Sequence, residues 1–196
     1  GLCFTHAPAS IAPAGAKLPV IGTNPFALAV PDEHGGARFV LDQSASVVAK
    51  SEVILRSRRG ESIPEGWALD AGGNPTTDPD AALKGSMLPS GGAKGFGVGL
   101  LVEVLASVLS GAVASRDASP FSGPAGGPPA TGQCFIAIDP AAYAPGFTTR
   151  LAALAEAIEG QDGARLPGAR RRAARERTSV EGVELDADLA RRLGLR

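Results

Sequence analysis

A cluster of glycines around one lysine is the segment of this sequence with the clearest chemical potential. Residues 91–99 hold five glycines and Lys94, and they lead into an apolar stretch that predicts a helix. Glycines let a ligand approach the backbone closely, and a helix N-terminus beside a lysine favours phosphate. The segment matches neither G-x-G-x-x-G nor G-x-x-x-x-G-K-[ST], so the standard nucleotide fingerprints are absent. It predicts either an anion site or a tight loop with close helix packing.

Two other segments carry groups that can bind anions. In Gly22-Thr23-Asn24-Pro25, a hydroxyl and an amide stand just before a predicted strand, where they could bond a carboxylate or a cofactor. The alternative is a turn held by local side-chain hydrogen bonds. Residues 165–177 hold six arginines. Some of them could reach a phosphate, and the alternative is a solvated helix face.

The other titratable residues form no catalytic set. Asp42, Asp70 and Asp78 are candidate acids, but aspartates at strand ends and turns are usually structural. His6 follows a predicted buried strand and is expected to be a hydrogen-bonded core histidine, whereas His34 is expected to be exposed in a turn. The sequence contains no Ser-His-Asp arrangement, no paired-carboxylate signature and no metal-ligand spacing.

Composition excludes several classes of partner. Of 196 residues, 44% are apolar and the net charge is −1, which gives no reason to expect nucleic acid or an anionic membrane as partner. No run of 18 apolar residues is present to span a bilayer. Cys3 and Cys134 stand far apart in apolar stretches, which predicts buried small hydrophobes in a reducing, cytoplasmic compartment.

The elements that must position these groups mix strands with helices, which indicates an α/β or α+β class. The helix from Gly95 to about Ser110 is so apolar that it is expected to be buried on most sides. Ser44 or Ser46 is expected to cap the first helix, and Asp78 or Asp80 the second. Strands are predicted over 1–5, 25–30, 38–41 and 134–138, loops over 60–78 and 115–133, and helices to about 57, from about 78 to 85, and over 95–110, 148–159, 169–177 and 186–193.

Seven segments taken together resemble the malate/L-lactate dehydrogenase-like family, which includes ketoacid reductases and reductases of cyclic imino acids (piperideine- and pyrroline-2-carboxylate). They are Thr5–Pro8 (THAP), Ile21–Ala29 (IGTNPFALA), Val40–Ser46 (VLDQSAS), Ile63–Asp70 (IPEGWALD), Gly73–Pro79 (GNPTTDP), Leu88–Gly95 (LPSGGAKG) and Leu166–Gly168 (LPG). The resemblance runs along nearly the whole chain and covers roughly the C-terminal three-fifths of a typical member.

The resemblance implies an architecture and a cofactor. It implies an α/β fold whose NAD(P)-binding domain is peculiar to the family rather than Rossmann-like. That domain would span residues 1–140, followed by a C-terminal helical segment over 141–196, with the N-terminal domain missing. It also implies NAD(P)H as cofactor, a small carboxylate as substrate and a homodimer as the assembly.

The resemblance also assigns roles to individual residues. Thr23 would contact the substrate. Glu52 occupies the place where imino-acid reductases of the family carry an acid that supports the catalytic histidine, although other members have a lysine there. The residues expected along the cofactor are Asp42, Gln43, Ser44, Ala93, Lys94, Gly168, Ala169 and Arg170.

One departure from the family limits what the chain is expected to do. The family's catalytic histidine and substrate-binding arginine belong to the N-terminal domain, and neither His6 nor His34 replaces the histidine. The expected activity is hydride transfer between NAD(P)H and C2 of a small 2-oxo or 2-hydroxy acid or a cyclic 2-imino acid. A missing general acid costs a factor of about 10² to 10⁴, so this chain alone is expected to be nearly inactive.

Two alternatives to this activity remain. The chain could be a non-catalytic fragment that retains a nucleotide-binding cleft, or a purely structural domain.

The resemblance also predicts how the C-terminal helices pack. In the family, the C-terminal helices pack on the N-terminal domain. Without that partner, five apolar side chains are expected to be exposed and the chain to be unstable, aggregated or oligomeric: Leu151, Leu154, Ile158, Leu185 and Leu189.

Overall fold

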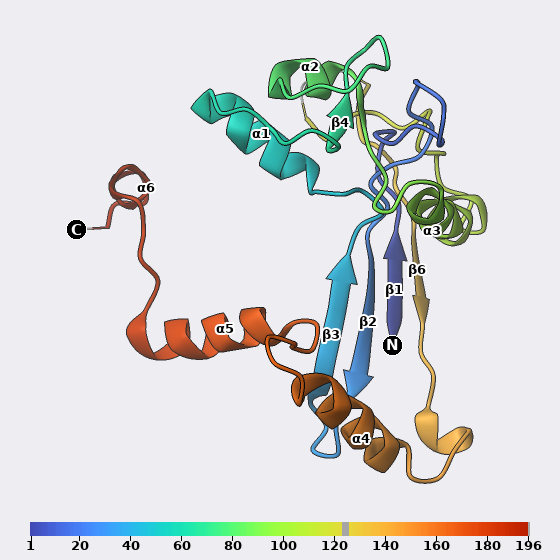
Figure 1. Cartoon of the computed structure of the whole chain (residues 1–196), viewed down its shortest axis with the longest axis vertical. Helices are drawn as coiled ribbons and strands as arrows, with labels where there is room; N and C mark the ends of the chain where they lie inside the picture. Colours follow the sequence, from blue (N-terminus) through green and yellow to red (C-terminus); the bar gives the residue numbers. More distant parts are fainter. Residues whose placement is uncertain (123–125, 196) are drawn as a thin grey trace.

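The central element is a four-stranded antiparallel sheet. The computed structural model describes residues 1–122 and 126–195. The strands β1 (Leu2–Thr5), β2 (Phe26–Pro31), β3 (Ala37–Gln43) and β6 (Gln133–Ile136) lie in the order β3-β2-β1-β6 (Figure 1). Phe4 pairs with Phe26 on one side and Cys134 on the other. All four strands lie within a residue or two of the predicted segments, so the mixed α/β class is confirmed.

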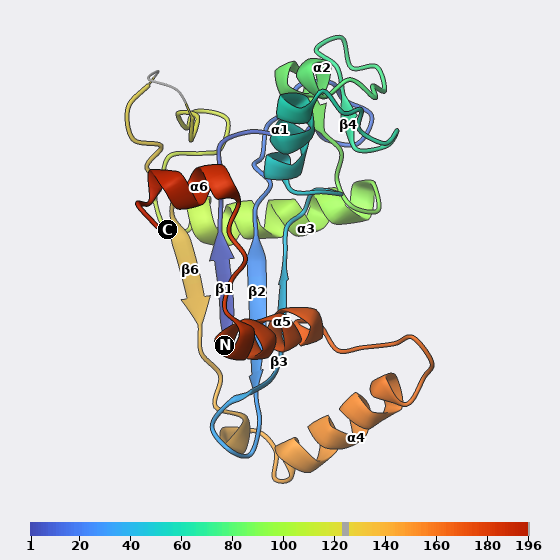
Figure 2. The same ribbon diagram turned by 90° about the vertical axis from the view of Figure 1, so that its left-hand side faces the viewer.

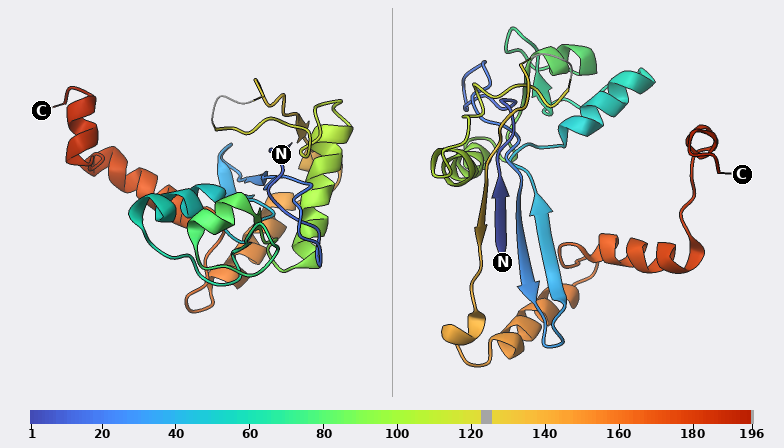
Figure 3. Two further views of the ribbon diagram at one scale, coloured as in Figure 1. Left: turned by 90° about the horizontal axis from the view of Figure 1, so that it is seen from above. Right: turned by 180° about the vertical axis from the view of Figure 1, so that it is seen from behind.

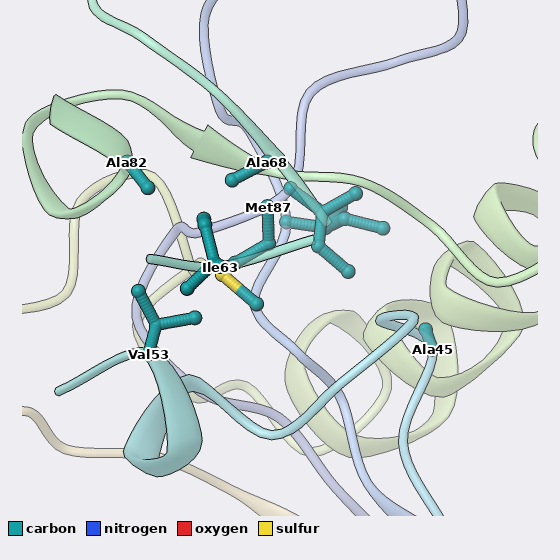
Figure 4. Close-up of a cluster of buried hydrophobic side chains, with 8 residues drawn as sticks. Ala45, Val53, Ile63, Ala68, Ala82 and Met87 are labelled. Atoms are coloured by element: carbon teal, nitrogen blue, oxygen red, sulfur yellow. The ribbon is translucent and has the colours of Figure 1, made fainter. Parts of the chain in front are cut away.

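A compact unit packs beyond one end of this sheet. It contains α1 (Lys50–Arg59), α2 (Pro79–Lys84) and a second sheet of β4 (Ala68–Leu69) and β5 (Ser86–Met87). Figure 4 shows the cluster of buried side chains at its centre. The cluster consists of Ile11, Ile21, Ala45, Val53, Ile63, Ala68, Ala82 and Met87. Small and β-branched residues dominate it, which lets loops and short elements pack closely.

Helix α3 (Ala93–Glu103) connects this unit to the sheet. It continues directly into a single π-helical turn over Val104–Val108, and the two cross the strands near one end of the sheet (Figure 2). Phe4, Val102 and Ala106 form a second core cluster at this crossing. These contacts fix the helix to β1, and its N-terminus lies at the edge of the compact unit.

The C-terminal helices lie apart from both clusters. After the 3₁₀ turn Pro140–Ala142 come α4 (Phe147–Glu159), α5 (Ala169–Glu181) and α6 (Ala187–Arg192). Helix α4 lies near the hairpin between β2 and β3, while α5 and α6 extend away from the sheet (Figure 3). Neither α5 nor α6 has a buried residue among those described. None of the described helices is long and apolar enough to cross a membrane.

The predicted caps are half right. Asp78 caps α2 by accepting from the backbone N–H of Asp80, as expected. The prediction that Ser44 or Ser46 caps α1 is wrong, because the helix begins at Lys50 and Ala49 stands at its cap position. The two serines are instead hydrogen-bonded to each other, and Ser46 donates to the carbonyl of Val48. In the predicted loop 115–133, residues 123–125 lie outside the described residues.

Three predictions of burial are wrong. Helix α3 and its π-helical turn contact the sheet on one side only, so the remaining apolar side chains face outward. This α3 ridge comprises Leu100, Leu101, Val104, Val108 and Leu109, which are 47% to 71% exposed. Cys3 is exposed on the uncovered face of the sheet, because successive strand residues alternate between the two faces. Cys134 lies on the covered face beside Phe4 but is only half-buried.

The chain exposes more surface than a compact protein of its size. Its accessible surface is 12522 Å², whereas about 8,600 Å² is typical of a folded monomer of this mass. The expected exposure of C-terminal apolar residues is confirmed for Leu154, Leu185 and Leu189. Leu151 and Ile158 are half-buried instead. The α3 ridge and the C-terminal helices thus carry apolar area that no other described residue covers.

The first prediction concerns this exposed area. We expect the 196-residue chain to sediment as an oligomer, because contiguous exposed apolar side chains drive association. Replacing Leu101 and Val108 together by Gln should shift the distribution toward monomer in analytical ultracentrifugation. Leu18→Gln is the control, since Leu18 is 74% exposed but lies outside the ridge. A wild-type chain that remains a monomer at all concentrations would contradict the expectation.

Candidate functional site

The largest set of predicted cofactor residues lines one cavity. This cavity, about 590 Å³ in volume, lies between the end of β3 and the start of α5, and we call it the arginine cavity. Five predicted residues form part of its wall: Asp42, Gln43, Gly168, Ala169 and Arg170. They come from segments more than 120 residues apart, so only the folded chain brings them together.

Gly168 is required where it stands. Its φ is +83°, and a Cβ at this position would lie 2.9 Å from the carbonyl oxygen of Val40. Side chains rarely adopt such a φ, and the neighbouring backbone of β3 leaves no room for one. Glycine therefore allows the loop to approach β3 closely and begin α5 directly at the cavity wall.

A second cavity adjoins the first. It measures about 330 Å³, shares Gln43 with the arginine cavity and is lined by Ser44, Ser46, Ala49 and Ser90 among others. We call it the serine cavity. Together the two form a polar path from the start of α5 to the start of α1, and they hold six of the eight predicted cofactor residues.

The glycine segment before α3 is closely packed at one position and open at others. Ala93 and Lys94 begin the helix, and Lys94 is exposed. Gly91 and Gly92 have φ of +71° and +65°, with open space where a side chain would lie. At Gly95, by contrast, a Cβ would lie 1.9 Å from the carbonyl oxygen of Ser90, so this glycine serves close packing. The first-turn N–H groups have no intrahelical acceptor, and an anion can approach them over bare backbone.

The segment 22–25 is held by a buried polar network. Asn24 is fully buried with φ +43°. Its side-chain N–H group donates to the carbonyl of Gly99 and to Glu103 Oε2, both at 2.9 Å, and its Oδ1 accepts from the N–H of Ala7. Glu103 also accepts from the N–H and the hydroxyl of Ser115. The Asn24 side chain is therefore structural, but its partners are 17 to 79 residues away, so it is not held by the local bonds that the turn interpretation predicted.

Thr23 and Glu52 lie outside both cavities. Thr23 is half-buried beside Asn24, and its carbonyl accepts from the N–H of Ala45. Glu52 forms an ion pair with Arg56 at 3.1 Å in the first turns of α1. The Arg56 guanidinium also lies 5.0 Å from the centre of the Trp67 ring and donates to the carbonyl of Ser62. The arrangement fixes Glu52 to the compact unit near the start of α1.

The two histidines match their predicted environments. His6 is buried, its Nδ1 accepts from the N–H of Gly132, and Nε2 lies 2.8 Å from the carbonyl of Val113. Since a carbonyl can only accept, Nε2 carries the proton. The His34 side chain is 83% exposed in the hairpin turn. Neither histidine lines the arginine or serine cavity.

Three other titratable residues have environments that bear on the site: Asp70, Lys50 and Glu103. The pKa of Asp70 lies below its usual value, chiefly because the backbone N–H of Asn74 donates to it, which fits a turn residue. Burial lowers the pKa of Lys50, whose ammonium donates to Ser10 at 3.4 Å. Lys50 follows Ala49 of the serine cavity, and nothing in the sequence indicated that its pKa is lowered. Glu103 was also missed, although a single acid in an apolar helix is a signal for such a residue.

Comparison with known proteins identifies the family. A model of the malate/L-lactate dehydrogenase family matches residues 1–194. The chain belongs to this family, as the resemblance predicted. It is 47% identical to a (2R)-3-sulfolactate dehydrogenase (NADP(+)) of Chromohalobacter salexigens over 184 residues, which are 94% of this chain and 55% of that protein. It is 44% identical to a Delta(1)-pyrroline-2-carboxylate reductase of Ancylobacter novellus, covering 95% of this chain and 56% of that protein.

Solved structures agree with this assignment. The delta1-piperideine-2-carboxylate reductase of Pseudomonas syringae pvar. tomato superposes with a TM-score of 0.87 at 36% identity, over 97% of this chain and 58% of that one. The sulfolactate dehydrogenase of Methanocaldococcus jannaschii gives 0.81 at 30% identity, over 100% and 59%. The chain thus spans somewhat more than half the length of these relatives.

The second prediction tests the buried network. Glu103→Gln should lower the free energy of unfolding by about 2 kcal/mol, because the new amide N–H group would face neighbours that also donate. Urea denaturation followed by circular dichroism measures this. Glu65→Gln, at an exposed loop position, is the control and should change stability by less than about 0.5 kcal/mol. Equal stabilities of the two variants would show that the Glu103 charge is not needed.

Proposed function

We propose that this chain forms the cofactor-binding part of an NAD(P)H-dependent oxidoreductase. The reaction is hydride transfer between NAD(P)H and C2 of a small 2-oxo or 2-hydroxy acid or a cyclic 2-imino acid. The observation that carries the proposal is the convergence of six predicted cofactor residues on two adjoining cavities. The names of the relatives, an NADP(+)-dependent sulfolactate dehydrogenase and a pyrroline-2-carboxylate reductase, support the same chemistry.

Donor groups in the two cavities and in the glycine segment that follows Ser90 of the serine cavity fit a dinucleotide. Arg170 and the first turn of α5 suit one phosphate group, while Lys94 and the open backbone of Gly91 and Gly92 suit another. Ser44 supplies a hydroxyl between them. When bound, the nicotinamide would supply the redox chemistry, and the residues of this chain would hold and orient it.

The proposed binding mode differs from that of a Rossmann fold. In open parallel sheets, dinucleotides bind beyond the carboxyl ends of the strands. The sheet of this chain is antiparallel, and its arginine cavity lies at the edge strand β3. We place the binding domain at residues 1–140 and the helical segment at 141–196. In support, neither core cluster contains a residue beyond Cys134.

Neither histidine of this chain is placed to donate the proton in the proposed reaction. His6 has both ring nitrogens hydrogen-bonded and His34 lies in the exposed hairpin, so neither can serve the cofactor cavities. We therefore assign the proton donor to a part of the enzyme outside these 196 residues, with Glu52 as the acid that supports this donor.

We also propose that the enzyme is a homodimer, in which protein covers the α3 ridge.

The direct test is a titration of the chain with NADPH and NADH by isothermal calorimetry. Binding of at least one dinucleotide is expected, and binding of neither would refute the proposal. Turnover of a 2-oxo acid and of a cyclic 2-imino acid by the chain alone should be lower by about 10² to 10⁴ than that of an enzyme with its general acid. If an enzyme that contains the chain turns over neither substrate class, the non-catalytic alternative gains support.

The third prediction concerns Lys94. Lys94→Ala should weaken NADPH binding by about tenfold, which is the loss of one charge-assisted hydrogen bond to phosphate. Fluorescence titration of the nicotinamide measures the affinity. Lys84→Ala is the matched control, because Lys84 is exposed at the end of α2 and lies outside the glycine segment before α3. An unchanged affinity in Lys94→Ala would exclude Lys94 from the site.

The fourth prediction concerns Thr23. In an active enzyme that includes this chain, Thr23→Val removes the hydroxyl and keeps the shape. The KM for substrate should rise by about tenfold while the KM for cofactor changes little, because the proposed bond is made to the substrate carboxylate or its neighbour. Thr149→Val, at an exposed position of α4, serves as control. Equal changes in both KM values would remove Thr23 from the substrate site.

A further inference from the structure

We propose that Arg56 is a positioning residue that holds the Glu52 carboxylate in place for the proton donor. The inference rests on the proposed function, in which Glu52 supports a donor outside these 196 residues. Arg56 lines neither the arginine cavity nor the serine cavity, so it acts through Glu52 rather than on cofactor or substrate. The basis of the proposal is the way in which three separate contacts hold the Arg56 guanidinium.

The Arg56 guanidinium is held from three directions. Its Nε donates to Glu52 Oε1 at 3.1 Å, and its Nη1 donates to the carbonyl oxygen of Ser62 at 2.9 Å. Its Cζ lies 5.0 Å from the centre of the Trp67 ring. That distance is within the roughly 6 Å over which an aromatic face attracts a guanidinium. A planar guanidinium can make all three contacts at once, because its donors lie in one plane and its face remains free for stacking.

The groups that hold Arg56 are themselves fixed by the compact unit. Trp67 packs against the buried cluster of this unit. Ser62 precedes Ile63, which is 2% exposed and whose N–H donates to the carbonyl of Thr77. The contacts of Arg56 therefore reach a part of the chain outside α1 whose position is already determined by packing. The guanidinium has little freedom to leave Glu52, so it can act as a rigid support.

Glu52 gains a fixed orientation from this arginine. It lies in the first turn of α1, three residues after Ala49 of the serine cavity. An unpaired glutamate on a helix surface samples several rotamers, and selecting one of them costs conformational entropy. Here Oε1 is bonded to Arg56, and within the described residues no group donates to Oε2. A carboxylate accepts at both oxygens, so Oε2 is left to accept from the proton donor.

The exposure of the pair separates a positioning role from a purely structural one. The side chains of Arg56 and Glu52 are 30% and 38% exposed, and such an i, i+4 pair by itself adds little to stability. If Arg56 only tied α1 to the segment at Ser62 and Trp67, its removal would have the same effect whether or not residue 52 is an acid. A positioning role instead makes the effect of Arg56 on the rate depend on the Glu52 carboxylate.

The experiment is a double-mutant cycle in an active enzyme that contains this chain. Arg56→Gln should lower kcat by about tenfold while both KM values change by less than about twofold, because a small displacement of a positioned group slows the chemical step. Glu52→Gln should lower kcat at least as much. Adding Arg56→Gln to Glu52→Gln should lower kcat no further, since the two residues act as one unit. Arg56→Lys keeps the charge without the planar contacts and should recover only part of the loss.

A matched control and the thermal stability of each variant define the outcomes. Arg59→Gln removes an exposed arginine from the end of α1 and should change neither kcat nor KM. If the enzyme turns over neither substrate class, the proposed function fails and this inference fails with it. If Arg56→Gln and Arg56→Lys both keep the wild-type kcat, the proposed function stands and this inference alone is overturned. The same holds if Arg56→Gln lowers the melting temperature and kcat equally with and without the Glu52 carboxylate, because Arg56 would then be structural.

Discussion

A single buried carboxylate connects the main parts of this chain. Glu103 lies where α3 crosses the sheet. The hydrogen bonds around it join three parts of the chain: residues 22–25 before β2, helix α3 and the segment at Ser115. A buried charge is tolerated only when several donors satisfy it, and removing any donor leaves the charge uncompensated. The requirement is mutual: Asn24 holds its positive φ because its side chain is bonded on three sides. The network thus fixes the C-terminal half of α3 relative to the segment that leads into β2.

The cofactor site follows from that frame. The end of β3 reaches the serine cavity, the start of α3 lies beside it, and α5 closes the arginine cavity from the other side. Three contacts hold these elements: the Glu103 network fixes the end of α3, Gly95 lies close to Ser90 at its start, and Gly168 lies close to Val40 at the start of α5. Two of the three contacts require glycine. Gly91 and Gly92 have open space where a side chain would lie, so a ligand can approach their backbone. Glycine thus allows close packing at some positions and ligand access at others.

Most local signals in the sequence were reliable, although the predicted Ser44 or Ser46 cap of α1 was wrong. Strand patterns, the Asp78 cap and the hydrogen-bonded state of His6 depend on near neighbours or on burial, and they could be predicted. The exposure of the α3 ridge could not, because apolar periodicity does not say how many faces of a helix are covered. The pair of Asp42 and Arg171 joins residues 129 positions apart. Residue type suggested anion binding for this arginine segment, but only the fold selects which arginines face the cavity.

The position of Trp67 makes separate parts of the chain observable. It is the one tryptophan in the sequence, and it packs against the buried cluster of the compact unit under the Arg56 guanidinium. Its fluorescence therefore reports on that unit alone. Helices α4, α5 and α6 contain no tryptophan but contribute strongly to far-ultraviolet circular dichroism. The two optical signals follow different regions of one polypeptide, so coincident melting curves would indicate cooperative unfolding and divergent curves independent loss of the C-terminal helices.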